Sequence, residues 1–253
     1  MKIMVPCQQC LRESIASGSI PETRFYRHDF NDNDTYIVTC DKGHVSATCH
    51  QSTRFEILID FGLWALVLGL EDAAYLRFYS AFEDFRAFFI RCWLHSQNIT
   101  QEEIRGVIGK IKRSEQQKGA FTLLNQLLAK THPTSVPKQP NVDRLTELRN
   151  KISHAGYIPT KDEVTSSCQS IMNYIVDTVI WLRTFMPDAI QAACMDILLE
   201  RSEGIRQSGF AGAIGTLSGP TAINLSVQDI KRISIKEGMS VVSENDFFVK
   251  PNL

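Results

Sequence analysis

The apolar residues of this chain change their spacing near residue 53, and this change limits the folds open to it. From about residue 53 to 186 they recur at the three-to-four-residue interval of amphipathic α-helices. In residues 1–52 the β-branched and aromatic run Thr35–Thr39 instead favours a short strand. We therefore expect a mainly α protein with a small β-rich module at its N-terminus.

The patterns divide the chain into three regions. These are an N-terminal module (1–52), a helical domain (53–186) and a C-terminal extension (187–253). In the extension we expect one more helix over 188–203. Glycine-rich sequence follows it, and then the β-type runs Arg232–Lys236 and Met239–Val242. In the N-terminal module, residues 22–27 are a candidate strand partner for Thr35–Thr39, and the module is too small to bury a core of its own.

Composition and charge restrict the classes of function. The chain has 253 residues, 43% of them hydrophobic, and a formal net charge of −1, so any nucleic acid must be bound through a local basic patch. Seven cysteines, four of them in the first fifty residues, argue against a disulfide framework. The apolar run Phe55–Leu70 contains two carboxylates and is short for a membrane span. We expect a soluble, cytoplasmic protein with no membrane partner.

Two short-spaced ligand pairs in the N-terminal module predict a metal site. They have the spacings C-x2-C and C-x3-H, and their residues are Cys7, Cys10, Cys40 and His44. Two such pairs on turns, joined by β-rich sequence, are typical of zinc-ribbon-like modules. Cys49 or His50 could take the place of His44. Because four protein ligands leave no open position, the expected zinc ion is structural, and no cofactor is expected for catalysis.

The segment Leu148–Gly156, with the sequence LRNKISHAG, contains Arg149, Asn150 and His154 where a helix gives way to a loop. In an unbroken helix, five residues would place Arg149 and His154 about 140° apart. We expect the helix to end near Ser153 and Gly156, with the glycine as its C-cap, so that His154 can swing back and both side chains can face one cleft.

This motif resembles the signature of the HEPN superfamily, which is an arginine, a polar residue and a histidine a few positions on. The likeness covers roughly residues 53–186, and Tyr79–Phe85 is similar to the first core helix of such domains. It implies a HEPN-like helical bundle that forms a two-fold homodimer in which two motifs meet. It also implies a metal-independent RNA endonuclease, acting as a toxin or anti-phage defence effector, with an antitoxin or other regulatory partner.

The residues of the motif suit that chemistry. Histidine exchanges protons near neutral pH, so His154 is the expected general acid or base. Arg149 presents a guanidinium fork to phosphate oxygens, and Asn150 could orient either side chain or the phosphate. Attack by the RNA 2′-hydroxyl would leave a 2′,3′-cyclic phosphate.

Other interpretations of the same residues remain. Arg149 could form a surface ion pair with Asp143 or Glu147, and His154 could be a helix-end histidine. The whole protein could be a non-catalytic HEPN dimer that binds nucleic acid or a protein partner through its zinc ribbon. A weaker alternative is a transcription regulator. A basic stretch that could contact RNA contains Lys110, Lys112, Arg113 and Lys118.

Overall fold

The computed structural model describes residues 2–18, 24–111, 114–132, 136–219, 221–226, 229–244 and 248–249. The chain divides into two compact units, which we describe separately. The first comprises residues 1–53, 194–220 and 245–253, and the second comprises 54–193 and 221–244. The C-terminal extension, which the sequence patterns indicated as one region, is therefore shared between both units.

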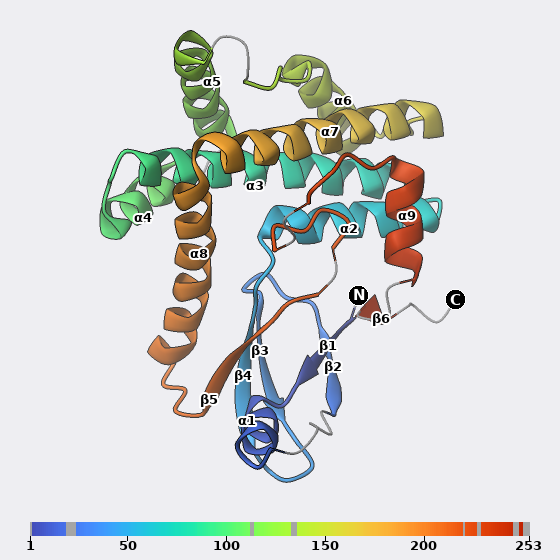
Figure 1. Ribbon diagram of the computed structural model, residues 1–253. Coiled ribbons are helices and arrows are strands. Elements are labelled where there is room, and N and C mark those ends of the chain that lie inside the picture. Colours follow the sequence, from blue (N-terminus) through green and yellow to red (C-terminus); the bar gives the residue numbers. More distant parts are fainter. Residues whose placement is uncertain are drawn as a thin grey trace. The chain divides into compact units, whose positions relative to one another are not determined.

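The first unit contains two three-stranded sheets, with strand orders β2-β1-β6 and β3-β4-β5 (Figure 1). Their elements are β1 (Lys2–Pro6), α1 (Gln8–Ala16), β2 (Phe25–Asp29), β3 (Thr35–Thr39), β4 (Val45–His50), β5 (Ala213–Leu217) and β6 (Phe248–Val249). The predicted strand Thr35–Thr39 is confirmed, but its predicted pairing with residues 22–27 is wrong. β2 pairs with β1, and β3 pairs with β4, which follows it across a short turn.

Residues from the C-terminal third complete this unit. Strand β5 adds to β4 in parallel, and the end of α8 (Pro187–Gln207) contributes Ile205 to a cluster with Ala47 and Cys49. Arg201 of α8 forms an ion pair of 2.5 Å with Asp34, and both side chains are at most 9% exposed. The N-terminal module thus gains from residues 194–220 the apolar surface that its own length does not supply.

The second unit is helical. Its helices are α2 (Arg54–Val67), α3 (Glu71–Ser96), α4 (Gln101–Lys110), α5 (Ser114–Thr131), α6 (Val142–Ala155), α7 (Lys161–Phe185), the first part of α8, and α9 (Ile235–Glu244). Helix α3 packs against α2, α4, α5, α6 and α7 (Figure 1). The mainly α character expected from the sequence is confirmed.

An aromatic stripe on α3 forms the core of the helical unit. Its members are at most 1% exposed and are Phe78, Phe82, Phe85 and Phe89. The Phe82 ring meets Phe121 of α5 and Tyr174 of α7 edge-on, with ring centroids 6.4 and 5.9 Å apart. Because such edge-to-face pairs add to the stabilisation from burial, this stripe fixes three helices around one centre.

Helix α9 corrects the β interpretation of residues 232–242. Ser234 caps the helix: its hydroxyl accepts from the Glu237 N–H, and the Glu237 carboxylate accepts from the Ser234 N–H. Ile235 and Val242 lie seven residues apart on one buried face, which packs against α2. The capping box and this spacing outweigh the strand preference of the β-branched residues.

The two carboxylates of α2 hold the segment Thr221–Ser226. Glu56 accepts from the Leu225 N–H at 2.7 Å, and Asp60 accepts from the Ala222 N–H at 2.9 Å. Both side chains are at most 1% exposed, and burial raises the pKa of Asp60 well above its usual range.

Among the described residues, no helix has both the length and the apolar character needed to cross a membrane.

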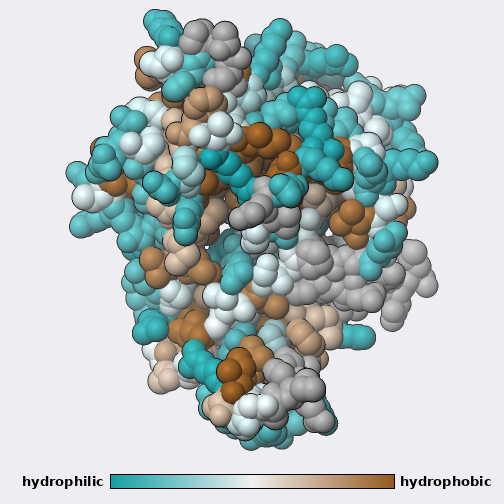
Figure 2. All heavy atoms as spheres, in the orientation of Figure 1, coloured by the Kyte–Doolittle hydropathy of each residue, from teal (hydrophilic) through white to brown (hydrophobic). Residues whose placement is uncertain are grey.

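Exposed side chains of the face drawn in Figure 2 are mixed in character. Hydrophilic residues cover much of it, and the hydrophobic ones form several separate groups. Scattered apolar side chains of this kind are normal on a protein surface, so we draw no binding site from them.

A substitution in α2 tests the close packing of α2 on α3. A Cβ atom at Gly62 would lie 2.5 Å from Cδ2 of Phe78, so Gly62→Ala should lower the free energy of unfolding by about 1–3 kcal/mol. Gly106 of α4 has open space around its would-be Cβ, so Gly106→Ala should be neutral or stabilise by up to about 1 kcal/mol. Urea unfolding of both variants checks this, and equal effects would contradict the packing.

Asp60→Asn tests the buried carboxylate by pH. The folded pKa of Asp60 is raised, so the folded state holds this proton more tightly than the unfolded chain. The stabilisation is complete below the ordinary aspartate pKa of 3.8 and is lost as pH rises through the raised value. The Asn variant keeps an acceptor for Ala222 but cannot ionise. Its unfolding free energy relative to wild type should therefore increase with pH, and parallel pH profiles would count against this.

Candidate functional site

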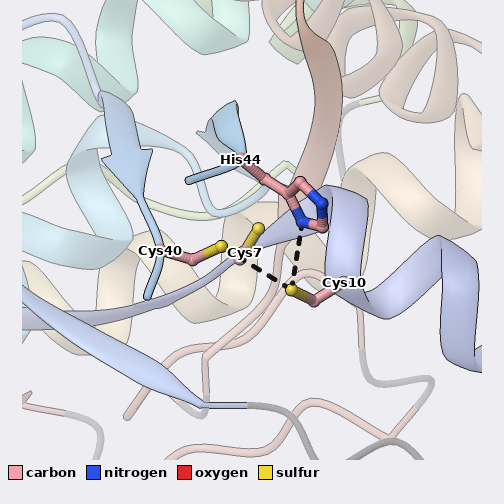
Figure 3. A group of neighbouring side chains, drawn as sticks. All are labelled: Cys7, Cys10, Cys40 and His44. Carbon is pink, nitrogen blue, oxygen red and sulfur yellow. Dashed lines mark hydrogen bonds between the residues drawn. The ribbon is translucent and has the colours of Figure 1, made fainter. Parts of the chain in front are cut away.

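The four predicted metal ligands come together in the first unit (Figure 3). Cys7 directly precedes α1, and Cys10 lies in its first turn. Cys40 and His44 flank the turn between β3 and β4. The first pair thus lies at the start of a helix, although the sequence pattern indicated turns for both pairs.

The side chains of the cluster point toward one centre. Their ligand atoms all lie within 4.8 Å of one another. The Sγ atoms of Cys10 and Cys40 are 3.8 Å apart, and Cys10 Sγ is 3.4 Å from Nδ1 of His44. A group of three thiols and one imidazole at these distances could hold a metal ion.

The β3–β4 turn fixes the second ligand pair. The Cys40 N–H donates to the His44 carbonyl at 3.0 Å, and the Gly43 N–H donates to the Cys40 carbonyl at 2.8 Å. Gly43 has a φ of +78°, a left-handed conformation that a residue with a Cβ atom adopts only with strain. This tight turn brings Cys40 and His44 to the same side of the hairpin.

His44, rather than its two alternatives, belongs to the cluster. Cys49 is fully buried and packs with Ala47 and Ile205. His50 is also fully buried, and its Nδ1 accepts from the Ser52 N–H at 3.1 Å. The sequence could not separate these candidates, because the choice depends on the length and register of β4, which place Cys49 opposite Thr35 at the far end of the hairpin from the turn.

The thiols of the cluster influence one another. Burial favours the neutral Cys7 thiol, but hydrogen bonds from the Cys10 backbone, from Ser46 and from the neighbouring thiols outweigh it and lower its pKa to about 7. Burial, together with hydrogen bonds and repulsion from Cys7 and Cys40, raises the pKa of Cys10 to about 12. A bound cation would stabilise the thiolate form of all three cysteines.

One neighbour of the cluster was not predicted from the sequence. Oε1 of Glu13, on α1, lies 3.5 Å from Nε2 of His44. No spacing rule indicates this contact, because it joins the second turn of a helix to a hairpin turn distant in sequence.

Helix α6 carries the second candidate site. Its N-cap is Asn141, whose side chain accepts from the Arg144 N–H, and its C-cap is Gly156, which has a left-handed φ of +63°. The expected helix end and its glycine cap are confirmed. The helix nevertheless includes His154, so the backbone does not turn this residue back toward Arg149 as expected.

The three motif residues are nevertheless in contact. Nη1 of Arg149 lies 3.1 Å from Oδ1 of Asn150 and 3.3 Å from Nε2 of His154. The helical backbone separates Arg149 and His154 by about 140° around the helix axis. The long arginine side chain reaches across this angle to the imidazole. Asn150 and His154 are exposed and Arg149 is half-buried, so all three are accessible to a ligand.

The neighbouring carboxylates have other partners than Arg149. Glu147 pairs with Lys151 at 2.7 Å, and Asp143 pairs with Lys118 of α5 at 3.0 Å. The alternative in which Arg149 is bound to either carboxylate therefore loses its support. Within the basic stretch, Lys112 and Arg113 lie outside the described residues.

Comparisons with known protein families, with curated proteins and with solved structures found no match to this chain. Its function must therefore be inferred from the residues and their geometry.

The metal content of the purified protein tests the cysteine cluster. We expect about one divalent ion per chain, and Cys40→Ala or His44→Ala should reduce this amount because each removes one of four ligands. Cys194→Ala removes a cysteine outside the cluster and should change nothing. Elemental analysis after dialysis provides the measurement, and full metal content in the Cys40 variant would exclude the site.

Proposed function

We propose that this protein is a metal-independent RNA endonuclease of HEPN type, with Arg149, Asn150 and His154 as its catalytic residues. The observation that carries the proposal is the convergence of Arg149 and His154, whose Nη1 and Nε2 atoms are 3.3 Å apart. A cation and a proton-exchanging ring in contact on an accessible helix face suit a phosphodiester substrate. The resemblance of the motif and its helices to the HEPN superfamily supports the same activity.

The proposed reaction uses the 2′-hydroxyl of RNA as nucleophile. His154 takes its proton while the 2′-oxygen attacks phosphorus, and the bond from phosphorus to the 5′-oxygen breaks. A proton returns to that leaving oxygen, so the products are a 2′,3′-cyclic phosphate and a 5′-hydroxyl. Arg149 neutralises the charge that develops on the non-bridging oxygens. Asn150 holds the guanidinium in place through its side-chain oxygen.

The remaining elements of the proposal come from the resemblance. A homodimer would bring two motifs together, so that one His154 acts as base and its twin as acid. The helical unit would then be a HEPN bundle. A nuclease that acts as a toxin or defence effector in the cytoplasm would also need an antitoxin or another regulatory partner.

We propose that the ion of the N-terminal unit is a structural zinc. For a tetrahedral ion, Zn–S and Zn–N bonds place two sulfurs about 3.8 Å apart and a sulfur and a nitrogen about 3.5 Å apart. The corresponding distances here are 3.8 Å and 3.4 Å. The donor set of three cysteines and one histidine leaves no position for substrate, so this ion would stabilise the fold without entering the reaction.

Cleavage assays in EDTA test the nuclease. His154→Ala should slow the cutting of total RNA by about 100- to 10,000-fold, because general acid–base catalysis contributes that much. Arg149→Ala should slow it by about 100- to 1,000-fold. Lys151→Ala is the matched control, since it removes a cation from the same helix without touching the motif. The products are examined for cyclic phosphate termini.

The outcomes separate the two classes of function. Unchanged cleavage in either motif variant excludes the proposed catalytic pair. If the wild-type protein binds RNA or a protein partner but never cuts RNA, the alternative of a non-catalytic HEPN dimer replaces the nuclease. Size-exclusion chromatography of each variant shows whether its assembly is intact.

A further inference from the structure

We infer that Glu13 is a positioning residue for the metal centre: its carboxylate accepts a hydrogen bond from Nε2–H of His44 and so aims Nδ1 at the ion. This inference rests on the proposed metal centre. It assigns a role outside the four ligands to a residue that the sequence did not indicate.

The two ring nitrogens of His44 face different groups. Nδ1 lies 3.4 Å from Cys10 Sγ, on the side of the cluster. Nε2 lies 3.5 Å from Oε1 of Glu13, on the opposite edge of the ring. A neutral imidazole carries one N–H, and the other nitrogen supplies the lone pair that binds a metal. The carboxylate beside Nε2 therefore favours the tautomer in which Nδ1 is the ligand.

Glu13 is itself held in place. Gln9, one helical turn earlier on α1, donates from Nε2 to Oε1 of Glu13 at 3.0 Å. The same oxygen thus accepts from Gln9 and faces His44. Because Gln9 already restrains the Glu13 carboxylate, less conformational entropy is lost when that carboxylate orients the imidazole.

Helix α1 also carries Cys7 at its start and Cys10 in its first turn, so Glu13 moves with two of the ligands. This helix is anchored on β4 by Gln8, whose N–H donates to Ser46 Oγ at 3.0 Å and whose Nε2 donates to Thr48 Oγ1 at 2.9 Å. Helix α1 therefore presents two of the thiol ligands, and it also carries the carboxylate that orients the fourth ligand, His44.

Metal affinity measured by competition with a chromophoric chelator tests the inference. Glu13→Ala should weaken zinc binding by about 10- to 100-fold, as removal of such outer partners does. Glu13→Gln keeps an acceptor oxygen and should retain most of the affinity. Asp41→Ala is the matched control, because Asp41 is a carboxylate next to the ligand Cys40 that pairs with Arg24 rather than with His44. It should leave the affinity within about twofold.

A double-mutant cycle separates this contact from general charge effects. His44→Cys replaces the imidazole with a thiolate, which has no N–H for Glu13 to accept. In that background Glu13→Ala should no longer weaken zinc binding, and it should tighten it slightly by removing a negative charge. Nitrogen NMR of the zinc-loaded wild type should show metal on Nδ1 and the proton on Nε2 of His44.

The results distinguish the failure of this inference from the failure of the metal centre. If the wild-type protein binds no zinc, both are overturned. If it binds zinc but Glu13→Ala and Asp41→Ala have equal affinities, the metal centre stands and the role of Glu13 is wrong. That role is also wrong if Glu13→Ala weakens binding equally with His44 and with Cys at position 44, or if NMR places the metal on Nε2.

Discussion

Burial of the aromatic face of α3 is the interaction on which the helical unit depends. Phe82 meets rings from α5 and α7, and Phe55 of α2 packs edge-on against Phe85 at 5.2 Å. The same helix holds α6 through its tyrosines, because Tyr75 donates to the Leu145 carbonyl at 2.7 Å and Tyr79 bonds the Thr146 hydroxyl at 3.0 Å. The buried side of α6 is thereby fixed to α3, and the side with Asn150 and His154 is left toward solvent.

The N-terminal unit is completed by residues from a distant region of the chain. Its described clusters of buried apolar residues are small, so the unit adds strand β5 and the end of α8 from a distant region of the chain. Arg201 bonds the carbonyls of His50 and Ser52 as well as Asp34, which joins that distant segment to β4. Long-range closure of this kind costs chain entropy, and a bound metal ion at the cluster would offset part of that cost.

The sequence predicted those features that depend on residues close together in the chain. The strand Thr35–Thr39 and the glycine cap of α6 were both accessible from residue types and spacing. The ligand pairs were accessible for the same reason. The parallel addition of β5 and the contact of Glu13 with His44 were not, since both join residues distant in the chain. Helix α9 was misinterpreted because its β-branched residues hid a capping box whose signal lay at Ser234.

The contact between Arg149 and His154 also constrains how the proposed reaction would begin. A guanidinium has only donors, so in this contact Nε2 of His154 can only be the acceptor. The lone pair of Nε2 would therefore become available to the 2′-hydroxyl proton only when Arg149 leaves it. The guanidinium would leave by turning to the phosphate, where negative charge develops as the 2′-oxygen attacks. Proton transfer and charge stabilisation would then be coupled through one contact on α6.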